Sequence, residues 1–239
     1  MSKTVKRGYL ENEQRDFSKK AISKLKEIGR DLYYLLNRGY YIKNSSTFLG
    51  NHHLLSKNQR LALVRSISSK ENIKYRLNKE IKESLENKTV YIDGFNTIIT
   101  LEVALSNSLL LKCMDKTIRD LAGLRGTYKL IDKTDIAIKL IGQTLVKYKA
   151  SKVVFYLDSP VSNSGKLKLK IIELLKNYDF ELDIIIIPNV DATLEKLENV
   201  ITTDAIILDK CKSWFNLNRC ILEEHLPEYE YVDFSDLME

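Results

Sequence analysis

The chain has 239 residues, enough for one large domain or two small ones with an ample hydrophobic core. Its three cysteines form no C-x-x-C pair, which argues against a zinc ribbon or a disulfide framework and predicts a reducing, cytoplasmic setting. The apolar runs are far shorter than a membrane span, and the N-terminus has no apolar signal-peptide core, so no membrane association is expected.

The net charge of +6 is divided unequally along the chain. Residues 1–88 contain 20 Lys and Arg against 9 Asp and Glu, a net charge of +11. Residues 89–239 contain the other 18 against 23, a net charge of −5. A basic part joined to an acidic part suggests a module that binds a polyanion beside a domain that uses carboxylates. A general lysine-rich bias of the composition is the alternative, because charge asymmetry alone is a weak signal.

In the first half, apolar residues recur at helical spacing and proline is absent. The expected elements are a helix over 18–40, a loop with a short turn over 42–56, and helices over 56–68 and 68–88. Gly39 is the expected stop of the first helix, because glycine readily adopts the positive φ that ends a helix. Ser56 is the expected N-cap of the second helix, and Ser68 or Ser69 that of the third. Residues 1–88 are therefore predicted to form a small, all-helical basic module.

From residue 89 the pattern changes to short apolar runs alternating with amphipathic helices. The predicted strands are 89–93, 152–158, 181–188, 199–204 and 230–234, and the predicted helices are about 98–111, 132–150, 164–178, 190–199 and, as AIILDKCKSWF, 205–215. Nearly continuous apolar strands alternating with helices indicate a parallel sheet covered on both faces. The predicted fold of residues 89–239 is a five-stranded parallel sheet sandwiched by helices.

Aspartates stand at the carboxyl ends of the predicted strands, which meet at one edge of a parallel sheet where ligands bind. The strand-end residues are Asp93, Asp158, the run Pro188-Asn189-Val190-Asp191, and Asp204, with Asn96 three residues after Asp93. Crowded carboxylates repel one another unless a cation is shared among them, and oxygen ligands of this kind suit Mg²⁺ or Mn²⁺. Each aspartate alone is better explained as a helix cap, but three of them together with Asn96 favour a metal site.

Three stretches, YIDGFNTIITLE, FYLDSPVSNSG and VITTDAIIL, resemble the three acidic motifs of PIN-like nuclease domains, close to their NYN branch. The N-terminal stretch LLNRGYYIKNSSTFLGNHHLLSKNQRLALVR and the inner stretch MDKTIRDLAGLRGTY are similar to a family of uncharacterised archaeal proteins. The two halves of those proteins carry only domain-of-unknown-function names. The resemblance covers roughly residues 31–65 and 89–234, and it implies a PIN-like fold for the second half.

The resemblance implies that Asp93, Asp158 and Asp204 are the catalytic, metal-binding carboxylates and that Asn96 positions a ligand or a water molecule. Glu102 and Asp209 would be outer candidates. Many PIN nucleases have one more acid on a helix in the middle of the domain, and here its only analogues are Glu102 and Asp120. The fourth acidic position therefore departs from the family pattern.

Two segments have open interpretations. In TIRDLAGLRGTY, at 117–128, Arg119 and Arg125 could contact phosphate, or Arg119 could pair with a site acid and order the loop. After Asp158, the residues around Ser162 and Ser164 could offer backbone N–H groups to a phosphate. Capping of the following helix by Ser162 or Ser164 is the alternative, and both roles are compatible.

Aromatic and basic residues alternate in the first half, a composition that suits stacking on unpaired bases and contacts with phosphate. Packing of about half of the tyrosines against the rest of the protein is an equally good account. The aromatic residues are Tyr33, Tyr34, Tyr40, Tyr41 and Tyr75, and the expected nucleic-acid contacts are Arg38, Lys43, Arg60 and Arg65.

The leading hypothesis is a Mg²⁺- or Mn²⁺-dependent nuclease that hydrolyses phosphodiester bonds of RNA at the strand-end carboxylates, with the basic module holding the nucleic acid. The alternative is an inactive PIN-like protein that binds RNA or acts as a scaffold, because a fold does not determine a function. The oligomeric state stays open, and a homo-oligomer is compatible with the sequence.

Overall fold

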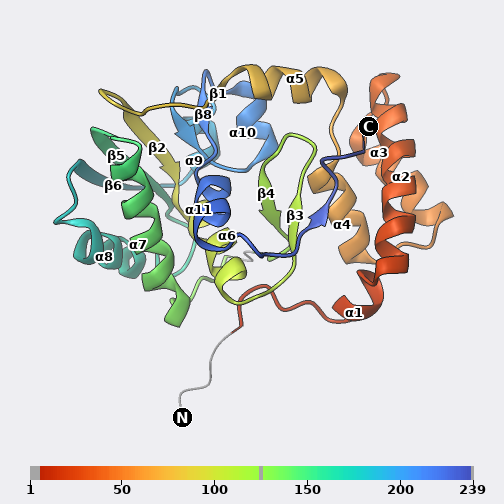
Figure 1. The fold of residues 1–239 in the computed structure, drawn as a ribbon, viewed down its shortest axis with the longest axis horizontal. Helices are drawn as coiled ribbons and strands as arrows, with labels where there is room; N and C mark the ends of the chain where they lie inside the picture. Colours follow the sequence, from red (N-terminus) through yellow and green to blue (C-terminus); the bar gives the residue numbers. More distant parts are fainter. Residues whose placement is uncertain (1–5, 124–125, 238–239) are drawn as a thin grey trace, which may run out of the picture. The chain divides into compact units, whose positions relative to one another are not determined.

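The structure is a computed structural model that describes residues 6–123 and 126–237 (Figure 1). The chain forms two compact units, each assembled from separate segments. We call residues 1–7, 79–108 and 122–229 the α/β unit, and residues 8–78, 109–121 and 230–239 the helical unit.

The α/β unit is built on a six-stranded sheet whose described strands all pair in parallel, in the order β1-β8-β7-β2-β5-β6. The strands are β1 (Glu80–Ile81), β2 (Thr89–Asp93), β5 (Lys152–Asp158), β6 (Glu181–Ile187), β7 (Val200–Ile201) and β8 (Trp214–Phe215). Four of the five predicted strands belong to this sheet, which has six strands where five were predicted. The prediction of a helix running through Trp214 and Phe215 was wrong, because both side chains are buried and their backbone extends the sheet beside β7 and β1.

Helices cover both faces of this sheet: α6 (Gly94–Leu105), α7 (Asp132–Lys147), α8 (Ser164–Leu175), α9 (Val190–Leu194), α10 (Ala205–Lys210) and α11 (Leu217–His225). On one face α7 lies against α6, α8 and α11, and Figure 1 shows α7 in front of β5 with α8 next to it. On the other face, residues of α9 and α10 form a buried cluster against Tyr91 and Tyr156. Because strand residues alternate between faces, Tyr91 and Asp93 share a face that Val90 and Ile92 do not.

The helical unit contains α1 (Glu13–Asp16), α2 (Lys19–Asn37), α3 (Ile42–His52), α4 (Lys57–Ser66) and α5 (Lys70–Asn78). The expected caps are confirmed for two helices. Ser56 and Gln59 form a capping box at α4, and the Ser69 hydroxyl accepts a hydrogen bond from the Asn72 N–H at the start of α5. Gly39 follows α2 with a φ of +84°, as its predicted role as a helix stop requires.

The loop predicted over 42–56 was wrong, because most of this segment is α3. The buried residues of α3 are Ser45, Ser46, Leu49 and Gly50. Three of these four are small or polar, so the inner face of the helix carries no apolar stripe in the sequence. The periodicity that reveals an amphipathic helix is therefore missing, although the helix packs between α2 and α4.

The helical unit also contains a small sheet in the order β4-β3-β9, formed by β3 (Leu110–Lys112), β4 (Ile118–Asp120) and β9 (Val232–Asp233). The strand predicted near the C-terminus therefore exists but does not belong to the large sheet, and the end of the helix predicted over 98–111 is β3. The chain turns between β3 and β4 at Lys116, which has a φ of +63°, while Asp115 accepts hydrogen bonds from the N–H and the hydroxyl of Thr117.

This arrangement differs from the predicted division into residues 1–88 and 89–239, and it changes the charge balance. The helical unit has 17 Lys and Arg against 12 Asp and Glu, a net charge of +5, and the α/β unit has 21 against 20, a net charge of +1. The contrast between the two units is thus weaker than the contrast between the two halves of the sequence. Among the described residues, no helix combines the length and the apolar character that crossing a membrane requires.

Candidate functional site

Asp93 lies at a sharp turn between β2 and α6. It ends the strand and caps the helix, since its Oδ1 accepts a hydrogen bond of 3.3 Å from the Asn96 N–H. Gly94 allows this turn, because a Cβ at that position would lie 2.5 Å from the Leu157 side chain and 3.0 Å from the Tyr156 carbonyl oxygen. The Asp93 side chain is consequently held in the interior, with the residue only 6% exposed.

The two threonines that follow β7 form hydrogen bonds with the polar residues that follow β2. The Thr202 hydroxyl donates a hydrogen bond of 2.9 Å to Asp93 Oδ2. The N–H and the hydroxyl of Thr203 each donate to Asn96 Oδ1, both at 2.9 Å. Asp204 then caps α10, accepting from backbone N–H groups of the first turn. The segments D-G-F-N and T-T-D, 107 residues apart in sequence, therefore form one hydrogen-bonded cluster.

This cluster lies where the strand order of the sheet reverses. From β2 the chain continues to β5 and β6 on one side, and then returns to β7 and β8 on the other. The helices that follow β2 and β7 pack in different layers, α6 with α7 and α10 with α9. In open parallel sheets, ligands bind at the carboxyl ends of the strands at such a reversal. Asp93, Asn96 and Asp204 therefore lie where sheets of this kind bind ligands.

Asp158 and Asp191 lie at the same edge of the sheet. We call Asp93, Asp158, Asp191 and Asp204 the acidic edge. Asp93 is paired with Tyr156, so Asp158 lies two residues further along the neighbouring strand on the same face, with its Cα about 8 Å from that of Asp93. Burial raises the pKa of Asp158, and the nearby backbone N–H of Val190 opposes this increase, which places the first turn of α9 at the end of β5. Asp191, in that turn, is brought next to the other acids.

The four carboxylates interact electrostatically. Burial raises the pKa of Asp93 to about 7, and the charges of Asp191 and Asp158 add to that increase, while the hydrogen bonds from Thr202 and Asn96 oppose it. Burial also raises the pKa of Asp191, and the charges of Asp204 and Asp158 contribute. Asp191 is thus coupled to each of the other three carboxylates. The sequence placed it at a strand end but did not single it out, because it follows β6 by four residues and only α9 returns it to the edge.

The oxygen ligands of this edge fit a hydrated Mg²⁺ or Mn²⁺ better than a closed metal cage. Among the residues that the structure describes, no group of three or more Asp, Glu, His or Cys side chains is gathered closely enough to enclose an ion. Mg²⁺ usually retains several waters and is held in proteins through one or two carboxylates together with substrate phosphates. Carboxylates that raise one another's pKa are a suitable donor set for such an ion.

Glu102, an outer candidate in the sequence, belongs to a different cluster. It lies nine residues beyond Asp93, about 13 Å along α6. Its carboxylate accepts hydrogen bonds from Arg7 Nε at 2.8 Å, from the Tyr128 hydroxyl at 2.6 Å, and from the Thr134 hydroxyl. Burial raises the pKa of Glu102 against the effect of these donors. The residue ties the N-terminal segment to α6 and is not part of the acidic edge.

Arg119 and Asp120 belong to the helical unit and to its internal structure. Arg119 is buried, and its guanidinium donates a hydrogen bond of 2.6 Å to Asp115 Oδ2. The Arg76 guanidinium donates a second hydrogen bond, of 2.7 Å, to the same oxygen. Although burial favours the neutral acid, the two guanidinium groups lower the pKa of Asp115 to about 2. Asp120 is paired with Arg65 at 3.6 Å. Arg119 therefore orders its loop through an acid that is not a strand-end aspartate.

The remaining candidates have modest roles. The N-cap of α8 is Asn163 rather than Ser162 or Ser164, so the expected serine cap was wrong. Asn163 has a φ of +64°, and its side-chain amide donates to the Tyr128 carbonyl oxygen at 2.6 Å. Asp209 is half-buried on α10, five residues after Asp204. Arg125 lies outside the described residues.

The four expected nucleic-acid contacts, all in the helical unit, divide into two pairs. Arg60 donates to the carbonyl oxygens of Gly50 and Leu55 and to Asn51, and Arg65 bonds the Asp120 carbonyl oxygen, so these two guanidinium groups hold the protein chain itself. Arg38 and Lys43 are exposed. The Arg38 guanidinium lies over the Tyr34 ring, 5.1 Å from its centre.

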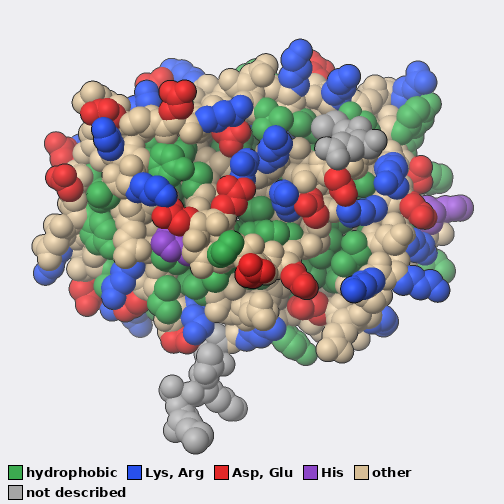
Figure 2. Space-filling view, in the orientation of Figure 1, with side chains coloured by type: hydrophobic (Ala, Val, Ile, Leu, Met, Phe, Trp, Pro, Cys, Tyr) green, Lys and Arg blue, Asp and Glu red, His purple; other side chains and the backbone are tan. Residues whose placement is uncertain are grey.

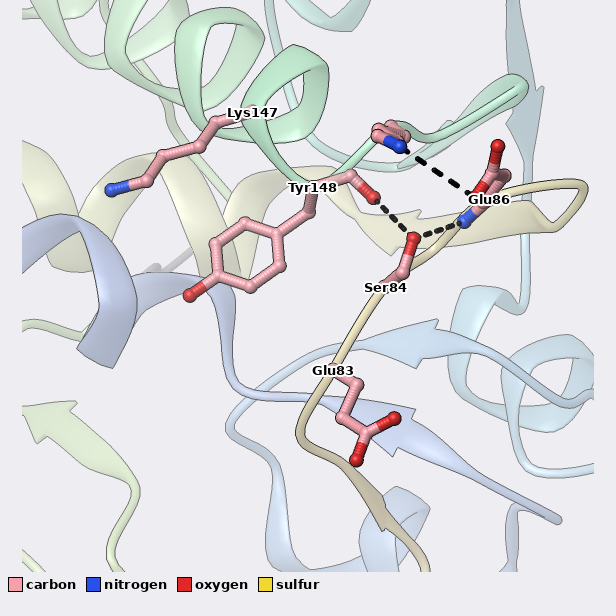
Figure 3. Close-up of a pocket in the computed structure, with 6 residues that line it drawn as sticks. Glu83, Ser84, Glu86, Lys147 and Tyr148 are labelled. Atoms are coloured by element: carbon pink, nitrogen blue, oxygen red, sulfur yellow. Dashed lines mark hydrogen bonds and ion pairs between the residues drawn. The ribbon is translucent and has the colours of Figure 1, made fainter.

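Two surface grooves of the α/β unit lie away from the acidic edge. One, of about 280 Å³, is lined by residues that precede β2 and β5: Glu83, Ser84, Glu86, Lys147, Tyr148 and Lys149 (Figure 3). Its polar groups are largely paired within the protein, since Ser84 bonds the Tyr148 carbonyl oxygen and the Glu86 N–H, and Lys149 pairs with Glu86. The second, of about 730 Å³, adjoins the first and also lies at the amino ends of the strands. Neither contains a strand-end aspartate.

Comparison with known proteins identifies both parts of the chain as domains without an assigned activity. Residues 82–220, more than half of the chain, match the family described as Domain of unknown function (DUF5616), and residues 24–79 match Protein of unknown function (DUF434). A protein of Methanocaldococcus jannaschii, Uncharacterized protein MJ0935, is 38% identical over 190 residues, which cover 79% of this chain and 89% of the relative. No solved structure was found to match. The chain belongs to the DUF5616 family.

Proposed function

We propose that this protein is a metal-dependent nuclease with a PIN-like α/β unit, and that it hydrolyses phosphodiester bonds of RNA at the acidic edge. The observation that carries the proposal is the coupling of Asp93, Asp158, Asp191 and Asp204 at the point where the strand order reverses. Mutually repelling carboxylates are unfavourable without a cation, and a metal ion at a sheet edge is a recurring solution for phosphodiester hydrolysis.

The residues of the edge would act in two layers. Asp158, Asp191 and Asp204 are at least partly exposed and would hold the ion together with water and substrate phosphate. Asp93 is buried beneath them and is fixed by Thr202, so it would supply the deepest oxygen. Bound Mg²⁺ or Mn²⁺ would activate a water molecule and offset the charge that develops on phosphate.

Asn96 would position a ligand rather than bind the ion through its carbonyl oxygen. That oxygen accepts two hydrogen bonds from Thr203, which fixes the side-chain amide in one orientation. The amide nitrogen is then the group that would donate to a water molecule or a phosphate oxygen. Pairing with Thr203 also keeps the start of α6 aligned with the start of α10, so that Asp93 and Asp204 keep their separation.

The second candidate function is an inactive scaffold or RNA-binding protein with the same fold. Two observations favour it: Asp93 and Asp204 serve as helix caps, and no group of three acids encloses an ion among the described residues. Aspartate is a favoured residue at both positions for that reason alone. The two candidate functions differ in whether the acidic edge binds a divalent cation.

The deciding experiment is calorimetric titration with Mn²⁺, in parallel with cleavage of labelled single-stranded RNA, for the wild type and for Asp191→Asn and Asp158→Asn. Both exposed acids can be neutralised with little change of shape. Each variant is expected to lose Mn²⁺ binding and at least a hundredfold of the cleavage rate. Asp179→Asn is the matched control, because Asp179 is an exposed aspartate in the turn before β6, at the opposite edge of the same sheet.

Wild-type protein that binds no Mn²⁺ and leaves RNA intact would exclude the nuclease and support the scaffold. Cleavage that survives in both variants would show that a contaminating enzyme or another site is responsible. Loss of binding in Asp179→Asn as well would mean that general surface charge, and not the edge, attracts the ion.

A further inference from the structure

The helical unit contains one long stretch without acidic residues. From Leu32 to Lys70 the sequence contains no Asp or Glu, while it contains two His and six Lys and Arg, of which Arg60 and Arg65 are bonded to carbonyl oxygens of the protein chain. This stretch comprises the end of α2, all of α3 and α4, and the segments between them. The absence of carboxylates within these 39 residues favours contact with a polyanion, although exposed Asp31 and Glu71 border the stretch.

Large aromatic side chains of the same stretch are exposed to solvent. The exposed fractions are 58% for Tyr34, 61% for Tyr40, 80% for Tyr41 and 64% for Phe48. Burying such side chains is strongly favourable, so a chain that only had to fold would gain by enclosing them. Within the described part of the chain, the hydroxyls of Tyr34, Tyr40 and Tyr41 have no hydrogen-bond partner. Folding of the helical unit therefore does not explain these side chains.

The backbone displays these rings around the end of α2. Tyr34 and Arg38 are four residues apart on the helix, which places them on one face, and the Arg38 guanidinium lies over the Tyr34 ring. Gly39, at a φ of +84°, turns the chain so that Tyr40 and Tyr41 follow outside the helix. Stacked guanidinium and ring present a flat surface with a positive charge, which suits a nucleobase and its phosphate.

The outer face of α3 continues this surface. Its inner face is buried against the unit, which leaves Lys43, Phe48 and His52 outward, and the rings of Phe48 and His52 are stacked with centres 6.2 Å apart. In Figure 2, hydrophobic, basic and histidine side chains lie beside one another over α2 and α3, with acidic side chains next to them. We call the side chains of Tyr34, Arg38, Tyr40, Tyr41, Lys43 and Phe48 the aromatic-basic face.

We propose that the aromatic-basic face binds single-stranded nucleic acid, with unpaired bases stacked on its rings and the phosphates near Arg38 and Lys43. The inference rests on the proposed nuclease function in that the strand held here would be the substrate. Rings stack on bases of any sequence, whereas bases inside a duplex are already stacked on one another, so a single strand is the ligand that this face fits. None of the six side chains is acidic and two are cationic, which favours a polyanion over a protein partner of mixed charge, although exposed Asp31 lies three residues before Tyr34 on α2.

The test measures binding without cleavage. Fluorescence anisotropy of labelled 15-nucleotide single-stranded RNA, single-stranded DNA and duplex RNA is recorded with the full chain in EDTA. The wild type is expected to bind both single strands more tightly than the duplex. Tyr41→Ala and Phe48→Ala are each expected to weaken single-strand binding about fivefold to a hundredfold, the range for removing one stacking ring.

Two variants separate stacking from charge. Tyr41→Phe keeps the ring and is expected to bind like the wild type. Lys43→Ala is expected to weaken all oligonucleotides alike and to reduce by about one the number of phosphate contacts obtained from the salt dependence. The matched control is Tyr9→Ala. Tyr9 is 74% exposed, but it precedes α1, which leads into the opposite end of α2. The Tyr9→Ala variant should therefore bind oligonucleotides like the wild type.

The inference is overturned if Tyr41→Ala and Phe48→Ala bind as tightly as the wild type while their melting curves show folded protein. It is equally overturned if the intact protein binds no oligonucleotide and the alanine variants instead change its oligomeric state, because the face would then be a contact between copies of the chain. The proposed nuclease can fail separately. Single-strand binding that persists in EDTA with no cleavage in Mn²⁺ would retain this face and exclude the nuclease.

Discussion

The buried carboxyl of Asp93 should make the stability of the metal-free protein fall as the pH rises. Its pKa is raised from 3.8 to about 7 in the folded protein. Between these two values the unfolded chain releases the proton while the folded protein keeps it, so the free energy of unfolding decreases with pH and levels off above about 7. A difference of about 3 pKa units, at 1.36 kcal/mol each, corresponds to at most about 4 kcal/mol.

Asp93→Asn removes this dependence because an amide has nearly the shape of the acid and does not ionise. Urea unfolding in EDTA at pH values from 4 to 8 measures it for the wild type and the variant. Between pH 4 and pH 8, the free energy of unfolding of the variant should rise by about 2–4 kcal/mol relative to that of the wild type. Adding Mn²⁺ at pH 8 should reverse the order, because an ion that binds only the folded wild type stabilises it in proportion to the logarithm of its concentration.

Parallel curves for the wild type and Asp93→Asn would refute this reasoning, since they would mean that Asp93 is ionised in the folded protein at every pH tested. Asp179→Asn serves as the control for removing one exposed carboxylate. Parallel curves with Asp93→Asn the less stable protein at every pH would mean that the hydrogen bond from Thr202 to the ionised Asp93 outweighs the cost of burying its charge.

Other substitutions test the contacts that support the fold. Asp115→Asn leaves the buried guanidinium groups of Arg76 and Arg119 without their counter-charge, and should lower the free energy of unfolding by about 3–5 kcal/mol at pH 7 in urea titrations. In the wild type this contribution should be lost only as the pH falls through the lowered pKa of about 2. Gly94→Ala brings a Cβ to 2.5 Å from a leucine side chain and 3.0 Å from a carbonyl oxygen, and should cost about 1–3 kcal/mol in thermal unfolding and weaken Mn²⁺ binding by shifting Asp93. Ser56→Ala removes the capping box of α4 and should cost about 1 kcal/mol in the same urea assay, with no effect on Mn²⁺ binding.

The position of the acidic edge explains why four acids can be kept in a small volume of this fold. Asp93 and Asp204 accept hydrogen bonds from the helices that they cap, and the Val190 N–H stabilises the ionised form of Asp158. These bonds offset part of the repulsion whether or not an ion is bound. The capping role and the proposed ligand role are therefore compatible, and metal titration rather than the geometry of the caps distinguishes the two candidate functions.

The local pattern of the sequence determined the elements whose signals lie within a few residues. The strands at 89, 152, 181 and 200 have β-rich apolar runs, and α4 and α5 have serine caps at their first turns, so short-range physics specifies them. The same holds for Asp93, Asn96, Asp158 and Asp204, because a parallel sheet brings all strand ends to one edge once the strands are known.

Tertiary structure decided what depends on distant partners. Trp214 and Phe215 form a strand only because β7 and β1 supply their hydrogen bonds, and β9 joins β3 rather than the large sheet because pairing partners are chosen by packing across the chain. The small buried residues of α3 give no apolar periodicity in the sequence, so this helix becomes evident only from its packing against neighbouring helices. The spacing of residues in the sequence does not reveal that Asp191 lies next to the other acids. Nor does it reveal that Arg60 donates a hydrogen bond to the Gly50 carbonyl oxygen.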